Sequence, residues 1–141
     1  MSIIWLFIVK IYLFGNEDVS ADRAAFTVAE KLAGKIPGAE FVIVKPNADL
    51  PFEGQSEVTI MDAAQGISEV AILDENDVDK LTVTKSVTVH DFDLGFQLKL
   101  LRKLGKLKKI TIIGIPREQT PDYDRIQSIL RKLVEQDIQG S

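Results

Sequence analysis

The residues best suited to chemistry in this sequence are two aspartates and its one histidine: Asp22, Asp62 and His90. The pattern of apolar residues places Asp62 at the end of a predicted strand and His90 just after another. It places Asp22 at the start of the helix that follows the first strand. In open α/β sheets, ligands bind beyond the carboxyl ends of the strands, so we expect the three side chains to meet at one edge of the sheet. Carboxylate oxygens and an imidazole nitrogen together suit a divalent transition metal such as nickel or zinc. Three protein ligands also leave positions open for a substrate.

Each of the three residues also has a simpler explanation. Asp22 lies at a predicted helix start, where a carboxylate is stabilised by roughly 0.3–1 kcal/mol, and Asp62 is placed where it would cap a turn. A histidine after a strand is more often a surface or hydrogen-bonded residue than a metal ligand. The metal site is therefore favoured by the convergence of the three residues and not by any one of them. Other polar residues that follow predicted strands are Asn16, Glu17, Asp18, Arg117 and Glu118.

Strands alternate with helices along the chain. Hydrophobic periodicity predicts strands at residues 3–14, 40–44, 57–63, 70–73, 81–89 and 109–115. It predicts helices at residues 22–36, 93–104 and 123–136. This order predicts one domain, residues 1–141, of the α/β class. We expect a three-layer α/β/α arrangement around a mostly parallel, twisted sheet of about five to six strands.

Turn and capping signals refine this assignment. Ser20 is a candidate N-cap of the first helix, and Gly34 and Gly105 are candidate helix ends. Residues 45–55, with two prolines, predict a loop, and residues 74–79 predict an acidic turn. We expect the strands on either side of that turn to pair as a hairpin.

The composition excludes several classes of protein. The chain of 141 residues has a net charge of −4, so its overall charge does not favour nucleic-acid binding. It has no cysteine, which rules out disulfides, thiolate metal sites and a cysteine nucleophile. The apolar run at residues 3–14 is shorter than the about 20 residues of a membrane-spanning helix and lacks the flanks of a secretory signal. We therefore expect no nucleic-acid partner and no membrane span.

A basic cluster lies between the second predicted helix and the strand that follows it. Its members are Lys99, Arg102, Lys103, Lys106, Lys108 and Lys109. Cations are favourable near a helix C-terminus, so a solvated helix end explains the cluster. A docking patch for an acidic partner is the alternative.

Four motifs, in this order and spacing, resemble the hydrogenase maturation proteases. The first is the Leu-Phe-Gly-Asn turn at residues 13–16 with an acidic residue at Asp22, and the second is the strand with Asp62 and Ala63 at its end. The third is Val-Thr-Val-His at residues 87–90, and the fourth is Ile-Ile-Gly-Ile-Pro at residues 112–116. Together they span most of the chain.

This resemblance implies a fold, an activity and a site. The fold would be phosphorylase/hydrolase-like, and the activity metal-dependent removal of the C-terminal extension of a nickel–iron hydrogenase large-subunit precursor. By position, Asp22, Asp62 and His90 would be the catalytic and metal-contacting residues. The metal would be nickel, contacted in the substrate, or another divalent metal such as zinc. The precursor would be the partner of a monomeric, cytoplasmic protein.

The first motif departs from the family pattern. Where the family usually has two adjacent acidic residues followed by glycine, this chain has Ala21-Asp22-Arg23. A catalytically silent metal- or partner-binding module of the same fold is therefore an alternative. Peptidyl-tRNA hydrolase also begins with a strand and a Gly-Asn turn but needs a histidine soon after it, and His90 is the only histidine here. Nucleotide binding is disfavoured because the turn at residues 15–18 is acidic and lacks further glycines.

Overall fold

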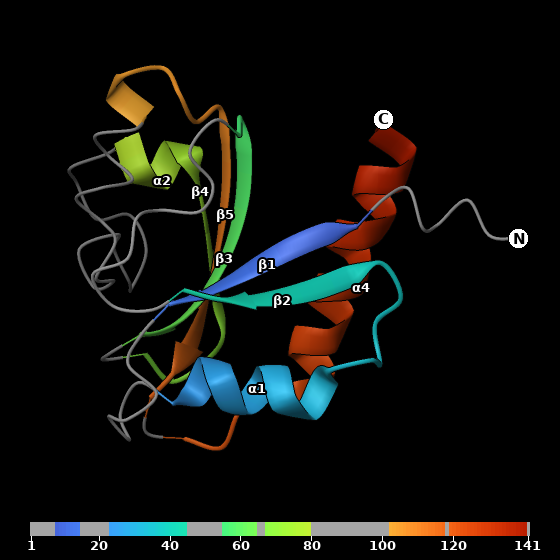
Figure 1. Ribbon diagram of the computed structural model, residues 1–141. Helices are drawn as coiled ribbons and strands as arrows, with labels where there is room; N and C mark the ends of the chain where they lie inside the picture. Colours follow the sequence, from blue (N-terminus) through green and yellow to red (C-terminus); the bar gives the residue numbers. More distant parts are fainter. Residues whose placement is uncertain are drawn as a thin grey trace, which may run out of the picture.

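The computed structural model describes residues 8–14, 23–44, 55–64, 67–79, 102–117 and 119–140 (Figure 1). In chain order the elements are β1 (Val9–Phe14), α1 (Ala24–Leu32), β2 (Ala39–Ile43), β3 (Glu57–Ala64), β4 (Ala71–Asp74), α2 (Glu75–Asp79), β5 (Lys109–Pro116) and α4 (Tyr123–Gly140). The described strands form one sheet in the order β2-β1-β3-β5-β4. All neighbours pair in parallel except β4, which runs antiparallel to β5 at one edge.

Two layers of helix cover the sheet, as the sequence predicted. α1 and α4 pack on one face, and the short α2 lies on the other (Figure 1). The two central strands, β3 and β5, are buried on both faces and read as nearly continuous apolar runs, which is typical of parallel strands between helices. The prediction of an α/β fold with a mostly parallel twisted sheet is confirmed.

The core divides into two clusters because successive side chains of a strand point to opposite faces. On β3, Val58 and Ile60 pack in the cluster that includes Val78 of α2. Met61, on the other face, packs with residues of α1 and with Ile126 of α4. The sequence position of a β3 residue therefore tells which layer its side chain meets.

The packing of α1 against α4 includes a contact between a cation and an aromatic ring. Lys31 lies near the end of α1, with its Nζ atom 5.7 Å from the centre of the Tyr123 ring at the start of α4. Such contacts contribute about 0.5–1 kcal/mol at exposed sites. The contact joins the two helices of this layer at residues that the apolar periodicity does not reveal.

We expect Lys31→Gln to lower the free energy of unfolding by about 0.5–1 kcal/mol, because the ammonium group no longer faces the ring. In the Tyr123→Leu background the same change should have almost no effect. Urea unfolding of the four proteins in this double-mutant cycle measures the coupling. Lys35→Gln, at an exposed lysine in the turn after α1, is the control. A coupling free energy near zero would contradict the assigned contact.

Two predicted boundaries were wrong, and each has a local cause. The first helix was expected to reach residue 36 but ends at Leu32, because Gly34 adopts a left-handed conformation with φ of +76°. The last helix was expected to end at residue 136 and continues to Gly140. Gly105 has a φ of +75° and follows a helical turn at residues 102–103, so its role as a helix end is confirmed.

The acidic turn predicted at residues 74–79 was also wrong, since residues 75–79 form α2. The side chain of Asp74 accepts hydrogen bonds from the backbone N–H groups of Asn76 and Asp77, at 3.0 and 3.1 Å. The side chain of Asp77 in turn accepts the N–H of Asp74, at 2.8 Å. These reciprocal bonds satisfy donors of the first helical turn and start a helix that the acidic composition concealed.

One member of the basic cluster supports the fold. The Arg102 guanidinium donates hydrogen bonds to the carbonyl groups of Leu107 and Lys108, both at 3.1 Å, and so holds the turn that precedes β5. The other described lysines of the cluster are exposed. A docking role for them stays a prediction.

Several expectations fall outside the described residues. Among these are the N-cap at Ser20, the loop at 45–55 apart from Gln55, the strand at 81–89 with its hairpin, Lys99 and most of the helix at 93–104. No helix in the described part of the chain is long and apolar enough to cross a membrane.

Candidate functional site

Asp62 lies near the carboxyl end of the central strand β3, at the edge of the sheet where the sequence predicted a site. In the strand register it stands between Phe14 of β1 and Gly114 of β5. Both neighbouring strands run parallel to β3, so all three present their carboxyl ends at this edge. The predicted position of Asp62 is confirmed as a matter of backbone geometry.

The burial of Asp62 is unusual for an acidic residue. Its side chain is 4% exposed, and among the described residues it is the only buried side chain that is polar or charged. Alternation along β3 places it on the same face as Ile60 and Ala64, the face that α2 covers. A buried carboxylate carries a substantial desolvation cost, so it persists where a hydrogen bond, a cation or a ligand compensates for that cost.

One oxygen of this carboxylate is held by the backbone. Oδ1 of Asp62 accepts the N–H of Ala63 at 2.8 Å. This bond fixes the direction of the carboxylate relative to the end of the strand. A carboxylate at a defined position is suited either to contact a cation or to accept a proton from water.

The residues on the β5 side of Asp62 are small, a feature that the sequence pattern did not predict. Gly114 is its register partner on β5, and Ala71 of β4 pairs with Gly114 on the far side. Phe14, Asp62, Gly114 and Ala71 are thus register partners across four adjacent strands. The last two of them have little or no side chain. Only the strand pairing reveals this arrangement, because the four residues lie on four different strands.

Arg117, another polar residue predicted to follow a strand, extends this edge. Its backbone N–H donates to the carbonyl of Ala64 at 3.3 Å, which continues the pairing of β3 with β5 past Pro116. The Nε atom of its guanidinium is buried. Arg117 and the buried carboxylate of Asp62 therefore both lie at the carboxyl ends of β5 and β3, which are neighbours in the sheet.

The other two predicted site residues, Asp22 and His90, lie outside the described residues. Asp22 immediately precedes Arg23, the N-cap position of α1, whose side chain makes no capping hydrogen bond. Figure 1 shows that α1 begins close to the carboxyl ends of the strands. Within the described ranges, no group of three or more His, Cys, Asp or Glu residues is placed to hold a metal ion. The three-residue site thus stays a prediction, of which the structure describes one member.

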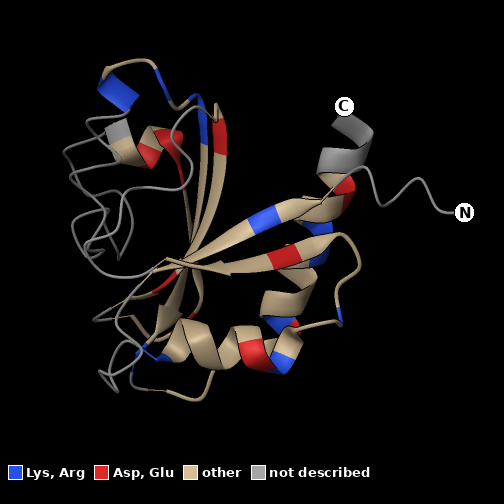
Figure 2. Cartoon of the chain, viewed as in Figure 1, with Lys and Arg blue, Asp and Glu red and all other residues tan. Residues whose placement is uncertain are grey.

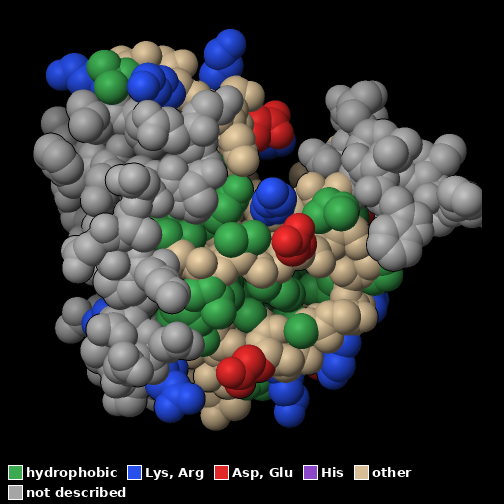
Figure 3. Space-filling view, viewed as in Figure 1, with side chains coloured by type: hydrophobic (Ala, Val, Ile, Leu, Met, Phe, Trp, Pro, Cys, Tyr) green, Lys and Arg blue, Asp and Glu red, His purple; other side chains and the backbone are tan. Residues whose placement is uncertain are grey.

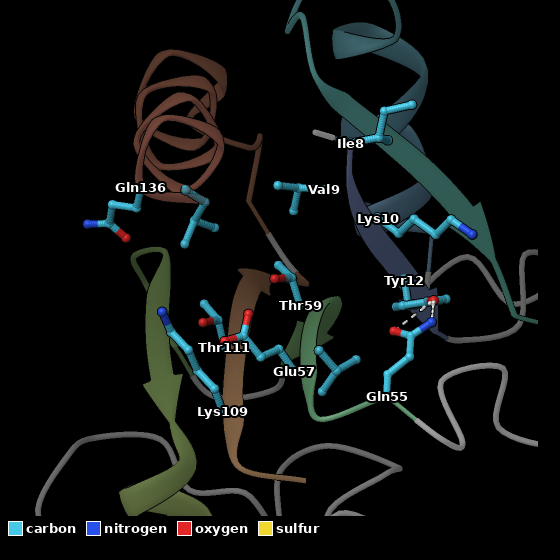
Figure 4. Close-up of a pocket in the computed structure, with 12 residues that line it drawn as sticks. Ile8, Val9, Lys10, Tyr12, Gln55, Glu57, Thr59, Lys109, Thr111 and Gln136 are labelled. Atoms are coloured by element: carbon cyan, nitrogen blue, oxygen red, sulfur yellow. Dashed lines mark hydrogen bonds between the residues drawn. The ribbon is translucent and has the colours of Figure 1, made fainter. Parts of the chain in front are cut away.

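A cavity opens at the opposite edge of the sheet. It has a volume of about 610 Å³ and lies between the amino ends of β1, β3 and β5 and the later part of α4 (Figure 4). Glu57, which lines the cavity, and Asp62 are five positions apart along β3, or roughly 16 Å of strand. In Figure 2 the charged residues lie at the amino ends of β3 and β5, on β1 and β2, and along the helices.

Comparison with known proteins gives a consistent result. The family model described as hydrogenase maturation protease matches residues 47–140, which is more than half of the chain. The crystal structure of a hydrogenase 3 maturation protease is similar with a TM-score of 0.53 and 19% sequence identity, over 89% of this chain and 88% of that one. The structure of a hydrogenase 2 maturation peptidase from Thaumarchaeota archaeon SCGC_AB-539-E09 is similar with a TM-score of 0.50 and 17% identity, over 92% and 97% of the two chains. At these identities the solved structures support the fold. No curated protein matches the sequence.

Proposed function

Because the chain belongs to the hydrogenase maturation protease family, and is thus a peptidase, we propose that it removes the C-terminal extension of a nickel–iron hydrogenase large-subunit precursor in a metal-dependent step. The observation that carries this proposal is the buried carboxylate of Asp62 at the carboxyl end of the central strand. The names of the two similar structures, a hydrogenase 3 maturation protease and a hydrogenase 2 maturation peptidase, support the same substrate class.

Three residues of this chain are proposed to contact nickel carried by the substrate: Asp22, Asp62 and His90. Two carboxylates and an imidazole suit nickel, and equally another divalent metal such as zinc. The burial of Asp62 fits a role beside a cation, because burying a carboxylate without a partner has a high desolvation free energy that a cation would offset. A bound divalent metal polarises a carbonyl group or lowers the pKa of water.

The protein's own part in the reaction is to position the substrate and to handle a proton. With no cysteine in the chain and no Ser-His-Asp order, a covalent acyl-enzyme is disfavoured. The N–H of Ala63 holds one oxygen of Asp62 and so fixes the direction of the carboxylate. We assign the carboxylate the role of a metal contact or of a base toward water. We propose further that the protein acts as a monomer in the cytoplasm, where the precursor is made.

Replacement of the only histidine tests the metal contact. We expect His90→Ala to slow precursor processing by about 10- to 100-fold. Removal of a residue that orients the ligands of a metal has an effect of this size. The measurement is the rate at which nickel-loaded precursor is converted to the shortened form on a denaturing gel. Asp22→Ala should act in the same direction, because it removes a second proposed contact.

The control separates metal contact from folding. Glu30→Ala changes an exposed residue of α1 and should leave both processing and thermal unfolding unchanged. Titration with nickel ions alone provides a readout independent of activity, since His90→Ala should weaken the binding of nickel. Normal processing by a folded His90→Ala protein would rule out this residue as a contact.

A further inference from the structure

The sheet opens between β1 and β3 at the amino-terminal ends of these strands. Pairing of these two strands begins at Ile11 and Thr59. Before that point β1 continues back to Val9 beside β2, and β3 continues back to Glu57 beside β5. β1 and β3 therefore separate toward their amino ends, and the cavity of about 610 Å³ occupies the opening.

Backbone groups face this opening from both sides. In a parallel sheet, alternate residues direct their N–H and C=O groups to opposite neighbours. The bonds from Val9 N–H to Gly38 and from Val44 N–H to Leu13 show that odd-numbered residues of β1 face β2. The groups of Lys10 therefore face β3.

The same argument applies to the other side of the opening. The carbonyl groups of Ser56 and Ala64 accept hydrogen bonds from residues of the β5 segment. Even-numbered positions of the β3 segment therefore face β5, and the N–H and C=O groups of Glu57 face β1. The opening thus lies between two strand edges, at Lys10 and Glu57, two exposed residues. Their backbone N–H and C=O groups are directed where a further strand could form hydrogen bonds.

The side chains around the opening come from both faces of the sheet. Thr59 and Thr111, which pair across β3 and β5, are half-buried and lie on the face that α4 covers. On the other face, the hydroxyl of Tyr12 and the side-chain amide of Gln55 are hydrogen-bonded at 3.2 Å (Figure 4). Figure 3 shows a hollow at this edge with acidic and basic side chains at its rim.

We propose that this cleft is a second substrate-binding site, in which an extended, acidic segment of the precursor binds as an added strand. Two exposed strand edges are the feature that an extended peptide recognises through its main chain. Alternating hydroxyl and apolar groups, such as Thr59 and Val58, would meet its side chains. Lys10 and Lys109 at the rim outnumber Glu57, although the chain as a whole is acidic, so the rim favours a segment with negative charge.

This inference rests on the proposed function and adds a docking step to it. The cleft lies at the amino end of β3, and Asp62 lies near the carboxyl end of the same strand. A segment held in the cleft would therefore bind without touching the reacting bond. It would raise the affinity for the whole precursor and leave the chemical step unchanged.

Reversal of charge at the rim tests the docking step by kinetics. We expect Lys10→Glu combined with Lys109→Glu to raise KM for the full precursor about tenfold with kcat unchanged, which corresponds to about 1.4 kcal/mol. The matched control is Lys35→Glu with Lys132→Glu, which makes the same change in net charge at exposed positions outside the cleft. Equal KM values for the two double variants would overturn the proposal.

A thiol placed in the cleft tests occupancy directly. Because the chain has no cysteine, Thr111→Cys introduces a unique reactive group. Saturating precursor should slow its alkylation by a maleimide, read as the intact mass of the protease chain. Thr27→Cys, on the exposed side of α1, should react at the same rate with and without precursor. If the precursor slows neither thiol, the cleft is not its docking site.

These outcomes distinguish the two proposals. A wild-type protein that shortens no precursor contradicts the proposed function, whatever the alkylation shows. The docking site alone is contradicted if the wild-type protein shortens the precursor, the cleft variants have unchanged KM and the precursor does not protect the cleft thiol.

Discussion

Asp62→Asn should slow precursor processing by about 10²- to 10⁴-fold and leave the fold intact, the range that a positioned acid or base contributes. Asparagine keeps an oxygen in place to accept the N–H of Ala63, so the local backbone contact is preserved. It removes the negative charge that the proposed metal contact needs and the basicity that water activation needs. The expected loss exceeds that of His90→Ala because the carboxylate is assigned both roles.

The measurement is the rate of precursor shortening under single-turnover conditions, with thermal unfolding recorded for the same protein. Asp124→Asn, at an exposed aspartate of α4, removes the same charge outside the proposed site and is the matched control. The assigned role of Asp62 would be abandoned if its asparagine variant, folded as the wild type, processed precursor within twofold of the normal rate.

Ile113→Ala should lower the free energy of unfolding by about 2–5 kcal/mol, the range for truncation of a buried isoleucine. The side chain is fully buried on β5, where its residue pairs with Met61 on one side and Ile72 on the other. It packs in the cluster that joins the sheet to α1 and α4, including Leu130. Its loss leaves a cavity that the surrounding strands and helices cannot readily fill.

Chemical denaturation measures this effect, and an exposed isoleucine provides the comparison. Ile43 on β2 is 54% exposed, and we expect Ile43→Ala to change the free energy of unfolding by about 0.5 kcal/mol or less. An equal effect at both positions would mean that the two-cluster core is wrongly assigned. Together with Asp62→Asn, this pair shows whether activity can be lost without loss of stability.

The elements of the fold were predictable where periodicity was strong. The apolar runs of β3 and β5 and the helical spacing of α1 and α4 identified strands and helices correctly, because these residues are buried by regular packing. The prediction failed at α2, where side-chain hydrogen bonds of Asp74 and Asp77 start a helix that has no apolar repeat. Capping of this kind depends on geometry that composition does not reveal.

By itself, the sequence determined the α/β class, the family resemblance and the place of Asp62 at the end of a strand, since these follow from local patterns and their order. Only the tertiary structure showed that Asp62 is buried, that Gly114 stands beside it and that β1 separates from β3 at the far edge. Burial, register and the divergence of strands arise from pairing between distant segments. No local pattern of residue types encodes which residues those pairings bring together.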